Sequence, residues 1–371
     1  MSVYTTREKF KAAVEVKGDN KNSAIDRHIE AASRKIDKEL GRFFYPKLQT
    51  RYFDWPPKDA PRQSLGWEVD ETYYITSIRG RQVLTLDEDF LTLSANGVTA
   101  KNGTVTIADA DIYLEPVNEG KPYKRLEINA ATSNANSVFQ SSTTPQRAIA
   151  VTGYWGYSDE TETAGTISGI SSGTTDTSGV VSNASLVEVG DTLLIESEQL
   201  QVTDRAFAAL GAILLNGALT NQLAARTVVV DAGHGILTGE VILVDSERMY
   251  VESVATNTLT VIKSYDGSTL AAHNDDTAVS INRAVTLVRG VNGTTAAAHA
   301  DGTTVMKYKT PGPISALCLS EAIFNFEQDE AGQTGVVGSG EGSSGVTAKS
   351  LMKQWEDVKC GYMRPLSRVG F

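Results

Sequence analysis

The chain has 371 residues, a formal net charge of −11 and a pI of about 5.0. This length fits about two or three domains, and a hydrophobic content of 41% is enough to build their cores. The acidic balance argues against general affinity for DNA, because binding to phosphates needs clustered Lys and Arg. The two cysteines, Cys318 and Cys360, give neither a metal-ligand spacing nor a disulfide framework.

No targeting or membrane segment stands out in the sequence. The N-terminus lacks the apolar run of a secretory signal peptide. The longest apolar run, residues 206–215, is far shorter than the roughly 20 residues that span a bilayer. We therefore expect folding in a reducing cytoplasm and no contact with a membrane.

The clearest helix lies within residues 22–46. Ser23 suits the N-cap, and Asp26 follows three residues later, as in a capping box. Apolar residues recur at steps of three and four and share one face, namely Ile25, Ile29, Ala32, Ile36 and Leu40. Gly41 suits a C-terminal cap, and Pro46 forbids further helix. The pattern predicts a core helix with a basic outer face that carries Arg27, Arg34, Lys35 and Lys38.

Strand-like segments separated by turn residues follow this helix. They are residues 49–55, 73–79, 81–86, 105–114, 125–129 and 148–157. From residue 158 Gly, Ser and Thr dominate, and the chain begins to repeat itself.

Two patterns recur between residues 186 and 305. Half A covers residues 186–203 and 236–252 and aligns Glu198 with Glu247. Half B covers residues 259–279 and 285–305 and aligns His273 with His299, and residues 213–229 read as a worn copy of it. Each A–B unit alternates apolar and polar residues and turns at Asp-Gly or Asn-Gly, as type I′ hairpins require. Two arrangements fit: tandem A–B units followed by an extra half B, or one unit nested inside the other.

The pattern becomes helical again after residue 310. Pro313 suits the first turn of a helix over residues 314–328. The Gly/Ser-rich residues 331–345 read as a flexible loop. A last helix over residues 347–358 has an apolar stripe of Leu351, Trp355 and Val358.

The C-terminal residues 347–371 are basic and aromatic within an acidic chain. Arg, Met and aromatic residues are enriched in the centres of protein interfaces. Two readings fit: an arm that binds a partner, or a helix packed on its own domain. The residues expected to bind a partner are Leu351, Trp355, Lys359, Tyr362, Arg364, Arg368 and Phe371.

No arrangement of residues points to catalysis. The Gly-rich residues 340–345 match a dinucleotide-binding pattern but lack the βαβ unit that it needs. His273 and His299 hold equivalent places in the repeats, which favours a packing role. No serine is paired with a base, and no metal motif occurs. We expect no catalytic residue, no cofactor and no metal site.

Four segments carry a resemblance to a known family. They read AIDRHIEAASRKIDKELGRFFYP, RYFDW, AVTGYWGYS and PISALCLSEAIFNFEQDE. With them the chain resembles the head–tail connector, or adaptor, proteins of tailed bacteriophages. The likeness covers both ends of the chain, whereas residues 159–309 replace a short loop of the family and have no family role.

The resemblance implies an α+β fold. A connector core with a small helical bundle and accessory β-strands would unite residues 1–158 and 310–371, and residues 159–309 would form an inserted all-β repeat domain. The resemblance also implies a dodecameric ring in the neck of the virion, assembled in the host cytoplasm. The C-terminal arm would bind the portal protein, and Arg27, Arg34, Lys35 and Lys38 would face a neighbouring subunit or the channel.

Such a ring extends the DNA channel and docks the next neck or tail protein. DNA would pass without specific binding, because an acidic lumen repels it. The alternative from the repeat region is a β-rich virion surface protein that binds a receptor or a glycan. An enzyme is the third and least favoured class.

Overall fold

The structure is a computed structural model that describes residues 2–55, 77–78, 81–209, 211–330 and 347–364. It divides into two compact units. The first unit contains Met1–Ile36 and Glu160–Gly361, and the second contains Asp37–Asp159 and Tyr362–Phe371. This division groups the terminal helices with the repeats, whereas the predicted domains were 1–158 with 310–371 and 159–309. Independent folding of residues 159–309 stays a prediction. The predicted flexible loop, residues 331–345, lies outside the described residues.

The predicted fold class, an α+β protein with a small helical bundle as its core, is wrong. The chain is mostly β, with 36% strand against 23% helix. Its described residues hold two sheets and four α-helices, and one sheet closes into a six-stranded barrel. The strands predicted as accessory pair with one another over long sequence distances, and local patterns do not encode such pairing.

The second unit is built on a seven-stranded sheet. Its strand order is β1-β7-β3-β6-β5, with β2 and β4 also paired to β3. The strands are β1 (Lys47–Phe53), β2 (Ser77–Ile78), β3 (Arg81–Ala100), β4 (Val105–Ile107), β5 (Ile112–Glu115), β6 (Tyr123–Ile128) and β7 (Ile149–Trp155). The rings of Phe90 and Trp155 meet edge to face at 4.7 Å in its core. Gly153 is required there, because a Cβ would lie 2.4 Å from the carbonyl oxygen of Thr92.

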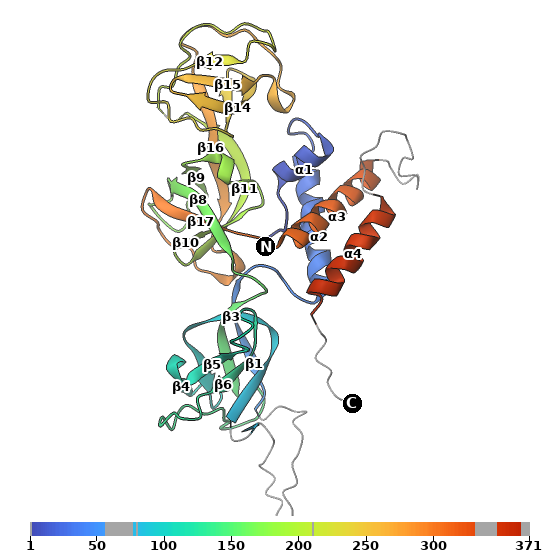
Figure 1. Cartoon of the computed structure of the whole chain (residues 1–371). Helices are drawn as coiled ribbons and strands as arrows, with labels where there is room; N and C mark the ends of the chain where they lie inside the picture. Colours follow the sequence, from blue (N-terminus) through green and yellow to red (C-terminus); the bar gives the residue numbers. More distant parts are fainter. Residues whose placement is uncertain (1, 56–76, 79–80, 210, 331–346, 365–371) are drawn as a thin grey trace, which may run out of the picture. The chain divides into compact units, whose positions relative to one another are not determined.

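A six-stranded barrel forms the centre of the first unit (Figure 1). Its order is β11-β10-β17-β8-β9-β16, and pairing of β11 with β16 closes it. The strands are β8 (Thr161–Ser168), β9 (Ser178–Val181), β10 (Thr192–Ile195), β11 (Glu198–Ala208), β16 (Val279–Val288) and β17 (Thr303–Tyr308). We call this barrel, with residues 161–208 and 284–308, the outer module.

A second β module repeats the same design on a separate core. It contains β12 (Thr227–Val229), β13 (Val241–Val244), β14 (Glu247–Ala255), β15 (Thr258–Ile262) and the first residues of β16. Isolated antiparallel bridges from Leu214 to Ala278, just before β16, and from Leu215 to Val230, just after β12, join the two edges of this module. We call residues 211–283 the inner module.

The two modules are nested. Glu198 of the first half A contacts His299, whereas Glu247 of the second half A contacts His273. Each module therefore combines one half A with one half B, and the inner module lies between the two halves of the outer one. Of the two arrangements that the sequence left open, the structure adopts the nested one.

Strand register is the same in both modules. Leu193 pairs with Lys307 in the outer module, and Ile242 pairs with Ile281 at the equivalent place in the inner one. Strands β9 and β12 also take equivalent places. Residues 213–229, read as a worn copy of half B, therefore include the counterpart of β9, and that reading is wrong.

Each module buries an acidic side chain against a histidine. Nε2 of His299 lies 2.8 Å from Glu198, and its Nδ1 lies 3.2 Å from the exposed Glu196. His273 repeats this geometry, with Nε2 2.9 Å from Glu247.

The same buried carboxylates organise the turns of half B. Glu198 accepts hydrogen bonds from the N–H groups of Gly290 and Ala297, and Glu247 accepts them from Ser264 and Ala271. Both carboxylates are fully buried. Glu198 also forms an ion pair with Arg289 at 2.8 Å. A buried charge is tolerated when it is paired and hydrogen-bonded in this way.

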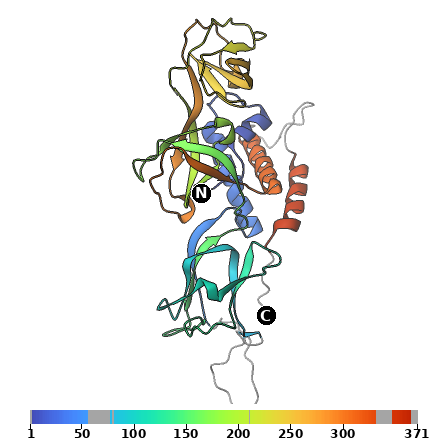
Figure 2. The same ribbon diagram turned by 60° about the vertical axis from the view of Figure 1, so that its left-hand side comes forward.

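Helices from both ends of the chain pack beside each other in the first unit (Figures 1 and 2). They are α1 (Arg7–Val14), α2 (Asn22–Leu40), α3 (Gly312–Glu330) and α4 (Ala348–Tyr362). The rings of Phe10 and Phe326 meet at 5.3 Å, and Ser33 lies 3.4 Å from Cys318.

The predicted stripe of α2 is confirmed, because Ile25, Ile29, Ala32, Ile36 and Leu40 are all buried. The cap at Ser23 is wrong, because the helix begins at Asn22. Gly41 has a φ of 64°, the left-handed value that a C-terminal cap needs.

Replacing Glu198 with Gln is expected to destabilise the outer module by about 3 kcal/mol, because it breaks a buried charge pair. Glu196→Gln is the matched control, because Glu196 contacts the same histidine but its side chain is 65% exposed. This variant should lose less than about 1 kcal/mol of stability. Hydrogen exchange of amides in β10 and β11 measures both changes, with β13 and β14 as an internal reference. Equal losses in the two variants would contradict the assignment.

The outer module should also lose stability in acid. Burial would raise the pKa of Glu198, but hydrogen bonds from Arg289, Ala297 and His299 outweigh it and lower the pKa from 4.5 to about 2. The unfolded chain then binds the proton first, so stability falls between about pH 4.5 and pH 2, by up to about 3 kcal/mol. The difference between wild type and Glu198→Gln should therefore shrink from pH 6 to pH 3 in the same exchange experiment. A constant difference would contradict this prediction.

Candidate partner-binding surfaces

The predicted C-terminal arm begins in a helix that packs on its own unit. Leu351 and Val358 of α4 are buried. Trp355 donates a hydrogen bond from Nε1 to Oε2 of Glu321 at 2.9 Å. Glu321 lies on α3 with a buried side chain, and it also accepts from Nζ of Lys35 at 2.6 Å. The carboxylate of Glu321 thus joins α2, α3 and α4.

Trp355 also lies between two cations. Nζ of Lys35 is 5.4 Å from its ring centroid, and Nζ of Lys359 is 5.5 Å away. Cation–π contacts of this length are attractive. The sequence assigned Lys35 to a subunit or channel surface and Trp355 to the portal, whereas the structure brings both to Glu321. Their roles toward a partner stay predictions.

Tyr362 and Arg364 belong to the second unit, where they are partly buried and contact other residues of the chain. The ring of Tyr362 lies 5.9 Å from Phe44 and 5.6 Å from Tyr157. Arg364 donates its N–H to the carbonyl of Leu40 at 3.0 Å. Its guanidinium reaches Oε2 of Glu88 at 3.2 Å. Arg368 and Phe371 lie outside the described residues.

A buried ion pair lies near Arg364 in this unit. Nε of Arg42 is 3.2 Å from Oδ2 of Asp89, and both side chains are buried. Burial raises the pKa of Asp89 and lowers that of Arg42, and the opposite charge of each partner offsets part of the shift. The charge of Arg364, like that of Arg42, lowers the pKa of Asp89. Arg364 of the arm therefore lies beside acidic residues of its own chain.

The basic face of α2 is partly used within the first unit. Arg27 forms an ion pair with Asp329 at 3.2 Å, and Arg34 donates to the carbonyl of Ser2. Lys38 is exposed. A neighbouring subunit or a channel as the partner of this face stays a prediction.

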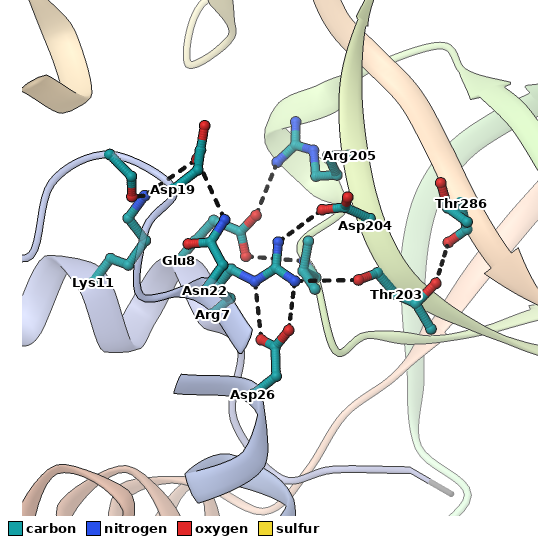
Figure 3. A network of polar contacts seen from close by, with 12 residues as sticks. Arg7, Glu8, Lys11, Asp19, Asn22, Asp26, Thr203, Asp204, Arg205 and Thr286 are labelled. Carbon is teal, nitrogen blue, oxygen red and sulfur yellow. Dashed lines mark hydrogen bonds and ion pairs between the residues drawn. The ribbon is translucent and has the colours of Figure 1, made fainter. Parts of the chain in front are cut away.

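Arg7 forms a hub that the sequence did not reveal (Figure 3). Its Nε donates to Asp26 of α2 at 2.9 Å, and its Nη1 donates to Asp204 of β11 at 2.8 Å. Burial alone would lower the pKa of Arg7, but hydrogen bonds and charges of Asp26 and Asp204 outweigh it and raise the pKa. The hub therefore attaches α1 and α2 to the outer module.

Residues beside Arg7 extend this attachment. The N–H of Arg7 donates to the carbonyl of Val189 at 3.0 Å, and Glu8 accepts from the N–H of Val189 at 2.9 Å. Thr6 donates to Glu188 at 2.6 Å. Burial raises the pKa of Glu8, and the charge of Arg205 offsets part of this shift. The start of α1 thus binds the loop before β10 through hydrogen bonds of both the main chain and side chains.

The last turn of α1 and the loop between α1 and α2 make equivalent contacts with the inner module. Nζ of Lys11 lies 3.0 Å from Asp266, and the N–H of Gly18 donates to the carbonyl of Asp266 at 3.0 Å. Arg248 bridges Asp266 at 2.7 Å and Asp19. A hydrogen bond from Arg248 lowers the pKa of Asp19.

Both modules use the same two positions for these contacts. Arg248 and Asp266 of the inner module correspond to Gln199 and Asn292 of the outer one. Asn292 donates to the hydroxyl of Ser2 at 2.8 Å and to Gln199 at 2.8 Å. At these aligned positions the two modules carry different residues, and it is these residues that contact the N-terminal part of the chain. The difference between the aligned residues was the sequence signal for these contacts.

The described residues contain no group of three His, Cys, Asp or Glu side chains that could hold a metal ion. No helix among them is both long and apolar enough to cross a membrane.

By its fold the chain is a mostly β protein with two nested modules attached to a small group of helices. Neither a scan of protein-family models nor a search of curated proteins found a match to it.

Replacing Arg7 with Met should weaken the attachment of α1 and α2 to the outer module by about 2–4 kcal/mol, because two carboxylates lose their partner. Hydrogen exchange of the amides of α1 measures the change. Lys9→Met is the matched control, because Lys9 is 53% exposed and 3.9 Å from Glu188; it should cost less than about 0.5 kcal/mol. Similar exchange in the two variants would show that Arg7 is not the hub.

Proposed function

We propose that this chain is a structural protein of the neck of a tailed bacteriophage. It assembles into a ring beneath the portal protein, extends the DNA channel and links the head to the next neck or tail protein. The resemblance of the terminal segments to connector proteins suggests twelve subunits in the ring. The role is assembly and not catalysis.

One observation carries the proposal: the segments with the connector resemblance pair with each other. The RYFDW segment ends strand β1, which runs antiparallel to β7 of the AVTGYWGYS segment, with Lys47 opposite Trp155. The helix of the first segment, α2, packs on the proline-initiated helix α3 through Ser33 and Cys318. Two of the four segments therefore pair with each other in the second unit, and the other two pack on each other in the first unit.

The charge of the chain agrees with this role. A net charge of −11 makes strong binding to DNA phosphates unfavourable. A channel protein must let DNA pass without retaining it, and like charge favours that.

The alternative, a receptor- or glycan-binding surface protein, finds less support. Glycan sites use exposed aromatic rings, and residues 186–305 offer Phe207, Tyr250 and Tyr265. Tyr250 stacks on Tyr265 at 5.3 Å, and the guanidinium of Arg248 lies 5.8 Å from the ring of Phe207. These rings are engaged by groups of the same chain.

Negative-stain electron microscopy with and without the portal protein of the same virion tests the proposal. We expect rings of uniform diameter that bind the portal. A chain that stays monomeric and does not bind the portal would overturn it.

Ending the chain after Arg364 removes Arg368 and Phe371 and leaves every contact described above. We expect at least about tenfold weaker binding to the portal protein, because interface anchors of this kind carry much of the affinity. The free energy of unfolding in urea should stay unchanged and serves as the control. Undiminished portal binding by the shortened chain would exclude Arg368 and Phe371 from the portal interface.

A further inference from the structure

A pocket of about 210 Å³ opens between the N-terminal segment, α2 and the outer module. An apolar cavity of about 150 Å³ can hold a benzene molecule, so this pocket is large enough for one aromatic side chain. The residues that matter for its chemistry are Val3, Thr5, Ile29, Glu30, Gly190 and Gln201.

The inner module shows what the equivalent place can hold. Gln201 and Gly190 of the outer module correspond to Tyr250 and Gly239 of the inner one. The ring of Tyr250 stacks on Tyr265, and a Cβ on Gly239 would lie 4.0 Å from its phenol oxygen. An aromatic ring therefore reaches toward Gly239, whereas the shorter Gln201 leaves the corresponding space beside Gly190 open.

The polar groups of the pocket suit a phenol. The side chain of Thr5 is 3% exposed, and its hydroxyl has no hydrogen-bond partner. A buried hydroxyl without a hydrogen-bond partner costs free energy. A ligand that supplies this partner removes the cost and therefore binds more tightly. Glu30 adds an exposed carboxylate, and Ile29 and Val3 add apolar wall.

A tyrosine of the second unit has the matching properties. Tyr52 is 60% exposed and lies on β1, which the described strands pair only through β7. An exposed edge strand presents unpaired N–H and C=O groups on which another chain can pair. Strand β1 carries no acidic residue, whereas the exposed Tyr113 shares its strand with Glu115, which would bring a second carboxylate toward Glu30.

We propose that Tyr52 of a second copy of this chain inserts into the pocket beside Gly190. The ring would rest on Ile29 and Val3, and its hydroxyl would bond Thr5 or Glu30. Strand β1 and the outer module then form a contact between subunits. The inference deepens the proposed ring, and it places the subunit contact on the outer module.

Cross-linking between copies tests this contact. Chains carrying Tyr52→Cys and Gln201→Cys are mixed in a Cys360→Ser background, which removes the exposed native thiol. Oxidation should give a disulfide-linked pair from the mixture and not from either variant alone. Tyr113→Cys mixed with Gln201→Cys is the matched control and should give none. No link in the first mixture, or equal yields in both, overturns the proposal.

A blocking variant gives an independent test. Gln201→Tyr copies the residue of the inner module, so the fold should be kept while the pocket is filled. Self-association, measured by sedimentation velocity, should weaken at least about tenfold, as it should for Tyr52→Ala. Rings of Gln201→Tyr that equal the wild type would overturn the pocket and leave the connector function standing. Cysteine variants that cross-link at these sites, together with a wild-type chain that forms no ring, would overturn the connector function instead.

Discussion

A fully buried glutamate that follows the hairpin turn holds each module together. Glu198 and Glu247 reach a histidine and the N–H groups of the half B turn that closes the same module. A charge in such a place is costly unless every partner is present. The interaction therefore selects one half B for each half A, which makes the nesting specific. A tandem pairing with the same sequence would have to satisfy the same buried carboxylates with other turns.

Nesting needs one further condition, which β11 and β16 meet. The chain leaves the outer module at the end of β11 and returns in β16, where Ala208 lies opposite Ile281. The two ends of the insertion are therefore neighbours, and the inner module can close its own core without stretching the outer one. Strand β16 serves both modules, because Ile281 pairs with Ile242 of the inner one and Ala284 with Val180 of the outer one.

Sequence patterns revealed the parts that repeat and missed those that join them. Alternation and aligned residues predicted the β repeats and the equivalence of His273 and His299, and three- and four-residue spacing predicted the buried face of α2. The fold class was wrong because pairing across the second unit joins residues far apart, such as Lys47 and Trp155. Glu321 could not be found either, because its partners Lys35 and Trp355 come from other helices.

Duplication separates the residues that build a module from those that attach it. Identical residues, such as the histidines, hold the core in both copies. Unlike residues at aligned places make the attachments: Gln199 and Asn292 lie at the N-terminal segment, and Arg248 and Asp266 at the loop before α2. Gln201 and Tyr250 are a further unlike pair, and there the smaller residue lines an open pocket. The proposed contact with a second copy of the chain uses this pocket.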